Sequence, residues 1–281
     1  GELVSLLGYF LIGYSDRFQL GNSVHLAPIF FIIGKILLHI GTGIADGPGR
    51  TMCLEIMPKS QKILVSSICV FDKTISAIII NSVGAFKLYE YTPFNNEKLL
   101  MILASIGSFV LTMVSIFSSP EERKTTKSKT LNPIAKMYNA LKSMDQRQWY
   151  ILVAHFFKSM ATAEFFARSA NFIAKYIFGG NNTDKKYLFD DGISCSQMLN
   201  VILTIGQCLC SFINPFLIKK LGFRLSYSIG TISAFLANLL YYLFPYKSTL
   251  FIPYLLMAVC TVITNSVPYA YLSLTSPQEK I

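Results

Sequence analysis

The sequence predicts an all-α membrane protein, a bundle of transmembrane helices. Of its 281 residues, 52% are hydrophobic and only 14% are charged, whereas a soluble domain carries about 25% charged residues. Several apolar runs reach the ~20 residues that a helix needs to cross a bilayer. None of them shows the ten-residue alternation of an outer-membrane barrel strand. The spanning elements are therefore expected to be helices.

The apolar runs define the expected helices in order. Seven of them are long enough to span the membrane: 26–49, 62–86, 99–118, 149–178, 197–216, 225–244 and 250–272. An eighth and shorter run, at 2–13, is interpreted as the tail of a helix whose start is absent. The chain then divides into a partial N-terminal helical half at 1–118, a cytoplasmic central loop at 119–148 and a partial C-terminal helical half at 149–281.

The central loop is the one long hydrophilic stretch. Its apolar residues recur at helical spacing, which predicts a short amphipathic helix lying at the membrane surface. These residues are Leu131, Ile134, Met137, Tyr138 and Leu141.

The distribution of lysine and arginine predicts the orientation of the helices. The loops after residues 49, 118, 216 and 272 hold thirteen such residues, and the opposite loops hold five. Because loops rich in Lys and Arg stay in the cytoplasm, the first group is placed there. Asn181 then begins an N-glycosylation sequon on the outer side, although such triplets also arise by chance. The protein is expected to be a multi-pass integral protein of the plasma membrane or of a vacuolar or endosomal membrane.

Several classes of function are excluded by what the chain lacks. The net charge of +10 is spread over short loops without a basic and aromatic patch, which argues against a nucleic-acid partner. The six cysteines lie mostly within apolar runs and lack metal-site spacing. No nucleophile–base pair, metal set or phosphate loop is present, so we expect neither an enzyme nor a cofactor or metal. The sequence leaves the oligomeric state open, with a homo-oligomer as one arrangement.

Charged residues beside or within the apolar runs are the candidate functional residues, because charge in hydrocarbon is costly. Arg50 and Glu55 stand near the end of the run at 26–49. A guanidinium presents five donors that suit polyol oxygens, and a carboxylate in a low-dielectric site can exchange its proton near neutral pH. The alternative is a pair of interfacial charges at the helix end. Asp72 and Lys73 form a second intramembrane pair, with a site role and a structural role equally open.

Further charged residues in the spans have both a functional and a structural interpretation. Lys35 and His39, one turn apart, could line a cavity or extend to the interface, and His39 is a candidate for proton relay. His155 and Lys158 are expected near the interface.

Five short motifs, taken together and in order, resemble the sucrose–proton symporters. These belong to the glycoside–pentoside–hexuronide branch of the major facilitator superfamily. The matching strings are 13–17 (GYSDR), 47–55 (GPGRTMCLE), 176–180 (YIFGG) with Tyr187 and Gly192, 219–224 (KKLGFR) and 265–270 (NSVPYA). The family has twelve helices, of which about seven or eight have counterparts here. Only 34 positions separate Asp16 from Arg50, too few for two helices, so we interpret the chain as a fragment or a shortened form.

The resemblance implies specific roles for residues of this chain. Arg50 would bind sugar hydroxyls and Glu55 would couple protons. Ser169 and Asn171 stand where the family has two aspartates; Asn171 can hydrogen-bond a sugar but cannot carry a proton. The full set of candidates is Arg50, Asn171, Ser169 and Asn265 for substrate; Glu55, Glu164 and Asp72 for proton coupling; and Asp16, Arg17, Lys220 and Arg224 for a cytoplasmic gate. The other interpretation of the Asp16–Arg17 turn is a solvated loop.

Aromatic residues of the span at 149–178 are further candidates for a sugar site. Phe165, Phe166 and Phe172 could stack on a sugar ring, although packing is the commoner role of aromatic residues in a span. The leading hypothesis is a symporter of sucrose or a related disaccharide or glucoside, driven by the proton gradient and working by alternating access. The alternatives are an uncoupled carrier of another polyhydroxy solute and a non-transporting membrane protein, either a sensor or a degenerate copy.

Overall fold

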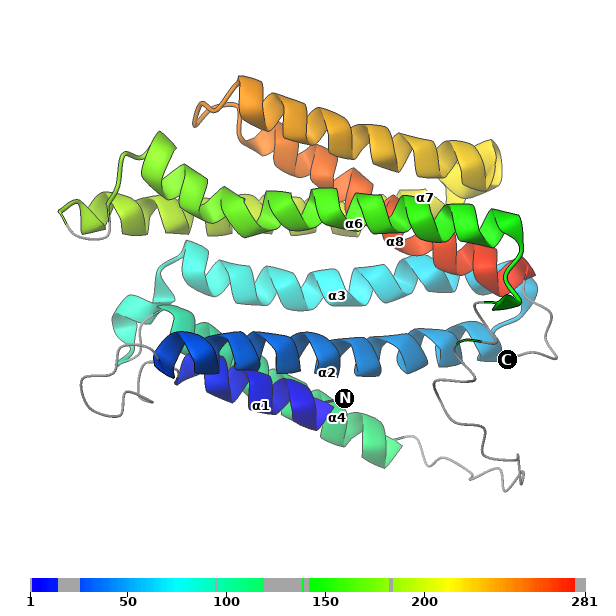
Figure 1. The fold of residues 1–281 in the computed structure, drawn as a ribbon, viewed down its shortest axis with the longest axis horizontal. Helices are drawn as coiled ribbons and strands as arrows, with labels where there is room; N and C mark the ends of the chain where they lie inside the picture. The colour runs from blue at the N-terminus through cyan, green and yellow to red at the C-terminus, as the bar shows by residue number, and fades with distance from the viewer. Residues whose placement is uncertain are drawn as a thin grey trace.

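The protein is a bundle of long helices, as the sequence predicts (Figure 1). The computed structural model describes residues 2–14, 26–93, 96–118, 138, 142–181 and 184–275. Within these ranges the extended structure amounts to one isolated antiparallel bridge between Asn181 and Lys185. The amphipathic helix predicted around 131–141 lies outside the described residues, apart from Tyr138.

The helices follow one another in chain order. Two short 3-10 turns, η2 and η3, flank α3, and a π-helical turn, η4, extends α6. The elements are α1 (Glu2–Gly13), α2 (Leu26–Ile56), η2 (Lys59–Gln61), α3 (Lys62–Ala85), η3 (Leu88–Tyr91), α4 (Asn96–Ser118), α6 (Gln146–Phe172), η4 (Ile173–Ile177), α7 (Lys186–Leu243) and α8 (Phe251–Thr275).

The helices pack in two groups. One contains α1, α2 and α4, with α1 against both of the others, and the second contains α6, α7 and α8, in which α7 and α8 share the most extensive contact. Between the two groups lies α3, as Figure 1 shows, and it packs mainly on α7 and α8. A helix from the expected N-terminal half thus packs on the C-terminal half.

The chain reverses at two ends of this bundle (Figure 1). At one end lie the end of α1, the start of α2, the α3–α4 connection and the turn from η4 into α7. The other carries the α2–α3 connection, the start of α6, the bend of α7 and the end of α8. The α2–α3 connection and the α7 bend thus lie at one end, and the α3–α4 connection and the turn into α7 at the other, as the lysine and arginine count groups these loops. We call the end with the α7 bend, whose loops are the lysine-rich group, the basic end.

A bend at Gly222 divides α7 into two arms. Gly222 has φ 79° and ψ 170°, a backbone conformation that residues with a Cβ rarely adopt. The arms contain the two predicted spans at 197–216 and 225–244. The first arm begins at Lys186, earlier than predicted, because a helix needs no apolar residues where it projects beyond hydrocarbon.

Four described helices are long and apolar enough to cross a membrane. They are Leu26–Ile44 within α2, α3, α7 with its two arms, and α8; shorter apolar segments lie at Leu3–Gly13 and Lys98–Val110. The sequence predicted a further span at 149–178, and this segment is helical as α6 and η4. Lys158 and Glu164 make α6 less apolar than the other four.

The best-packed core lies among α6, α7 and α8. Its fully buried members include Ile173, Tyr254 and Met257, and Phe165 is 4% exposed. The ring of Phe165 makes edge contacts with Tyr241 and Tyr254 at centroid distances of 5.2 Å. This phenylalanine therefore packs in the core. By contrast, Phe166 is 40% exposed.

The first group depends on a close approach of α1 and α2 at two glycines. A Cβ added to Gly8 would lie 2.6 Å from the Leu38 backbone nitrogen and 2.8 Å from the Gly34 carbonyl oxygen. Since backbone atoms cannot move aside as a flexible side chain can, this crossing requires glycine. Small residues that let helix backbones touch are typical of membrane helix pairs.

Replacing Gly8 with alanine should therefore destabilise the protein by about 1–3 kcal/mol through overpacking. The matched control is Gly107→Ala on α4, where an added Cβ meets nothing within 4 Å. That change should be neutral or stabilising by about 0.5–1 kcal/mol, since alanine is the better helix former. Thermal unfolding of the detergent-purified variants measures both effects, and equal shifts for the two would contradict the predicted crossing.

Candidate functional site

A buried lysine on α6 contacts an asparagine on α8. Lys158 is 8% exposed, and its Nζ donates to Oδ1 of Asn265 at 3.2 Å. Lys158 lies twelve residues after the first residue of α6, and Asn265 lies ten before the last of α8. At 1.5 Å per residue these are depths of about 18 Å and 15 Å from the basic end. Both residues therefore lie well inside the bundle rather than at its end.

Asn214 on α7 joins three helices through its amide. Its Nδ2 donates to Ser67 Oγ on α3 at 3.0 Å and to Ser266 Oγ on α8 at 2.6 Å. The two hydroxyls in turn donate to Ile63 O and Val262 O of their own helices. Because both hydroxyl protons are used in this way, the amide nitrogen rather than the oxygen must face them. We call these three side chains the Asn214 junction.

The Asn214 junction leaves one polar atom over. The Oδ1 of Asn214 is buried and has no hydrogen-bond partner within the described ranges. Two further contacts line the same seam: Ser66 Oγ donates to Ser266 O at 2.8 Å, and Gln207 Nε2 donates to Thr261 Oγ1 at 2.6 Å. The seam between α3, α7 and α8 is thus built from neutral hydroxyl and amide groups.

A second buried lysine lies at the basic end of the bundle. Lys62 is 5% exposed, and its Nζ donates to Ser273 O in the last turn of α8 at 2.9 Å. A cation at a helix C-terminus is favourable because carbonyls without intrahelical partners gather there. Where side chains are described, the buried charged residues are these two lysines, and no carboxylate is buried.

At the end of the bundle opposite the basic end, an ion pair links two segments of the chain. Lys87 Nζ lies 2.6 Å from Asp191 Oδ1, which ties the α3–α4 connection to the first turns of α7. The hydrogen bond to Asp191 raises the pKa of Lys87 above its ordinary value of 10.5, with burial acting in the opposite direction. Below pH 10.5 Lys87 therefore contributes its full stabilisation to the folded state. The contribution is lost as pH rises through the raised pKa of Lys87.

The sequence-predicted pair on α2 is described only as backbone. Arg50 and Glu55 belong to α2, which runs unbroken to Ile56, but their side chains lie outside the described part of the structure. The same holds for the Asp72 side chain on α3. Asp16 and Arg17 lie wholly outside the described residues. The end of α1 and the start of α2, which flank them, lie at the end of the bundle opposite the α7 bend. Lys220 and Arg224 are exposed at the bend itself.

The predicted residues on α6 are placed on different faces. Glu164 is exposed and pairs with Arg168 one turn on, with Oε1 and Nε 2.5 Å apart. The Ser169 side chain is buried, and its carbonyl accepts from the Tyr241 hydroxyl at 3.2 Å. Asn171 is exposed. The structure thus does not bring Ser169 and Asn171 together on one surface.

The remaining candidates lie on exposed surfaces. On α2, Lys35 and His39 are exposed, and Lys35 Nζ lies 5.8 Å from the centroid of the Phe31 ring. Lys73 is exposed on α3. Asn181, the sequon residue, is exposed beside its bridge to Lys185.

Sequence reasoning missed the Asn214 junction and placed Lys158 at the interface. A usable signal was present on α7, where Gln207, Ser211 and Asn214 recur at helical spacing within an apolar run. On α3, Ser67 and Thr74 are likewise seven residues apart. Polar residues on one helix face within an apolar span indicate a face turned to protein.

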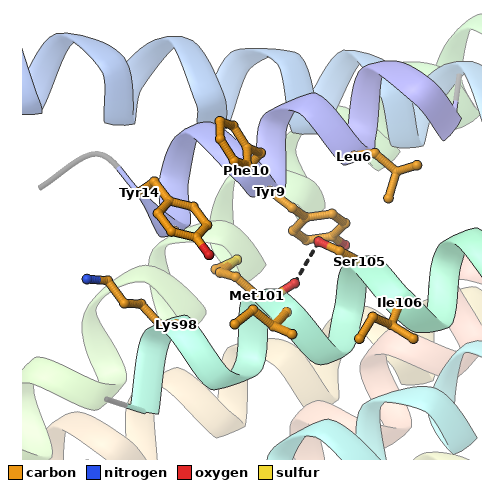
Figure 2. A pocket seen from close by; sticks show the side chains of 10 residues that line it. Leu6, Tyr9, Phe10, Tyr14, Lys98, Met101, Ser105 and Ile106 are labelled. Carbon is orange, nitrogen blue, oxygen red and sulfur yellow. Dashed lines mark hydrogen bonds between the residues drawn. The ribbon is translucent and has the colours of Figure 1, made fainter. Parts of the chain in front are cut away.

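Figure 2 shows a crevice between α1 and α4, with a volume of about 310 Å³. Its walls are mainly apolar, with Tyr14 and Lys98 near one end. The Ser105 hydroxyl donates to the Met101 carbonyl of its own helix at 2.7 Å, so its proton is already used. None of the sequence-predicted site residues lines this crevice, and it offers no polar constellation for a solute.

The helical architecture and the polar groups between its spans agree with a comparison against protein families. The family model described as Major Facilitator Superfamily matches residues 1–281. The chain belongs to the major facilitator superfamily. No curated protein matches it. Members of the superfamily are secondary transporters rather than enzymes, and the apolar helices are those of a multi-pass integral membrane protein.

In this superfamily member, Asn214 should contribute to stability because its amide joins three helices. Asn214→Ala removes both donated hydrogen bonds and should cost about 1–2 kcal/mol. The matched control is Asn238→Ala, because within the described residues Asn238 Nδ2 donates to Ala234 O of its own helix, at 2.9 Å, and to no other helix. Unfolding midpoints in detergent compare the two. If Asn238→Ala were as destabilising as Asn214→Ala, the assignment of a three-helix link would be wrong.

Proposed function

We propose that the protein is a proton-coupled symporter of sucrose or a related disaccharide or glucoside, working by alternating access. Membership of the major facilitator superfamily supports transport, and the ordered motifs that resemble the sucrose–proton symporters support the sugar. The observation that carries the proposal is the Lys158–Asn265 pair. An ionisable side chain buried between membrane helices is by default a functional residue.

The chemistry of this pair suits a polyhydroxy solute. An ammonium group offers three donors, and an amide offers two donors and an acceptor with two lone pairs. In the structure the two side chains form one hydrogen bond with each other, in which Lys158 Nζ donates to Asn265 Oδ1 at 3.2 Å. Sugar hydroxyls can replace that bond on both sides, because each hydroxyl donates and accepts. Exchange of one buried hydrogen bond for several lets substrate enter without leaving the cation unsolvated.

The proton-coupling part of the proposal rests on Glu55. It is the candidate with a matched counterpart in the resembled family, and it shares a helix with Arg50. Substrate bound near both groups would link occupancy to protonation of the carboxylate. Glu164 is a weaker candidate, because its carboxylate is exposed and already paired with Arg168.

A second candidate function is uncoupled carriage of another polyhydroxy solute. One observation favours it: the charged side chains that the structure describes as buried are lysines, and the described carboxylates are all exposed or half-buried. Proton coupling through a carboxylate then depends wholly on Glu55 and Asp72. Gradient-driven uptake separates the two functions.

Substitution of the buried pair should weaken sugar transport. In vesicles containing the purified protein, Lys158→Met should raise the half-saturating concentration of labelled sucrose or maltose by about tenfold, as expected for a lost charged hydrogen bond. Asn265→Ala should act in the same direction. Lys175→Met is the control, because Lys175 is exposed on η4. Unchanged uptake in a folded Lys158→Met protein would remove the pair from the substrate site.

Neutralising Glu55 should abolish the dependence of uptake on the proton gradient. In the wild type an inward proton gradient should accelerate sucrose uptake, and Glu55→Gln should transport at the same rate with and without it. Exchange of sugar at equal pH is the control for folding, since it requires no net proton movement. Sucrose uptake by the wild type that does not depend on the proton gradient would favour the uncoupled carrier. Normal gradient-driven uptake by Glu55→Gln would show that Glu55 does not couple protons.

A further inference from the structure

A cavity of about 650 Å³ lies at the basic end of the bundle, apart from the Lys158–Asn265 pair. Three helix ends form its walls: the first turns of α6 with Tyr150, the second arm of α7 from Phe223 to Ser228, and the last turns of α8 with Tyr271. Figure 1 shows these three ends meeting where α7 bends. The rings of Phe223 and Tyr271 meet edge-on at 5.6 Å and brace the wall between α7 and α8.

The polar groups of the cavity are donors. Among the described residues that line it, Arg224 is the charged one, and its side chain is exposed. The Tyr227 hydroxyl is buried, and no described residue forms a hydrogen bond with it. A buried hydroxyl without a partner is costly, so an acceptor that reached it would be stabilised. Ser228 is already committed, because its Oγ donates to Arg224 O at 3.1 Å.

The surroundings add positive charge. Lys219 and Lys220 are exposed just before the Gly222 bend, and Lys62 lies at the same end with its Nζ on the Ser273 carbonyl. Among described side chains the carboxylate at this end is Asp145, which is occupied in capping α6: its Oδ1 accepts from the Gln148 backbone N–H at 2.8 Å. The field at the cavity therefore favours an anion.

We propose that this cavity binds an anionic phospholipid of the leaflet that faces the cytoplasm. Its phosphodiester would accept from the Arg224 guanidinium and the Tyr227 hydroxyl, and the aromatic wall would contact the glycerol and upper acyl chains. Tyrosines at a membrane interface present an apolar ring and a polar tip to this boundary. Basic pockets between membrane helices on the cytoplasmic side have the chemistry that anionic headgroups require. The site is independent of the transported solute.

The chain carries a natural reporter for the test. Trp149 is the one tryptophan in the sequence, it is 41% exposed, and it directly precedes Tyr150 of the cavity wall. Bromine atoms on lipid chains quench tryptophan fluorescence on contact. Reconstitution of the full chain in phosphatidylcholine with increasing fractions of dibrominated phosphatidylserine, and separately of dibrominated phosphatidylcholine, gives the relative affinity of the two lipids beside Trp149.

The wild type should prefer phosphatidylserine over phosphatidylcholine by about fivefold, the effect expected of one cation near an anionic surface. Arg224→Gln should remove most of this preference, Arg224→Lys should retain part of it, and Tyr227→Phe should reduce it a few fold through loss of one hydrogen bond. The controls are Lys186→Gln, exposed at the opposite end, and Tyr242→Phe, an exposed tyrosine of the same arm. Circular dichroism confirms that each variant is folded.

The outcomes separate the proposal from its rivals. Loss of the preference in Arg224→Gln with both controls unchanged supports it. An unchanged preference in Arg224→Gln would overturn it, as would equal quenching by the two lipids, which is expected if another protein segment fills the cavity. Millimolar inorganic phosphate provides the last arm: if it displaced phosphatidylserine completely, the site would belong to a soluble anion instead.

Discussion

The packing of the second helix group depends on one buried amide. Asn214 lies 1% exposed between α3, α7 and α8, and both of its donated bonds cross from one helix to another. In lipid there is no hydrophobic force to hold helices together, so small residues and hydrogen bonds between side chains decide which faces meet. This amide also sets the place of α3, which follows α2 in the chain yet packs mainly on α7 and α8. The neighbouring Lys158–Asn265 bond extends the same polar seam to α6.

Much of the fold could be predicted from the sequence, because a membrane allows a single kind of local structure for a long apolar run. With no water to satisfy backbone groups, such a run must be helical, and every predicted span is helical in the described residues. The ends of the helices were less predictable. Apolar length marks where hydrocarbon begins, while a helix continues as far as its hydrogen bonds and caps allow. For this reason α7 begins at Lys186, and α6 begins at Gln146, where the Asp145 side chain caps it.

The candidate site could be predicted only as a set of residue types. Hydropathy locates a charge along a span but says nothing about the direction in which it points around the helix. Lys158 and Glu164, six residues apart on α6, show the consequence: the lysine is turned inward to Asn265, and the carboxylate is turned outward to Arg168. Asn265 entered the prediction through a motif, but its partner is set by how α6 packs on α8. The π-helical turn at Ile173–Ile177 also had no evident signal in the sequence.

The distribution of charge constrains how such a bundle can work. Where side chains are described, the interior holds lysines whose partners are neutral: an amide for Lys158 and a helix carbonyl for Lys62. A cation with a neutral partner is held less firmly than one in an ion pair, so exchange of that partner costs less free energy. Buried salt bridges would make such exchange unfavourable, because separating two buried opposite charges costs several kcal/mol, about 3–5. The seam of amides and hydroxyls therefore holds α3, α7 and α8 together through neutral hydrogen bonds rather than through buried ion pairs.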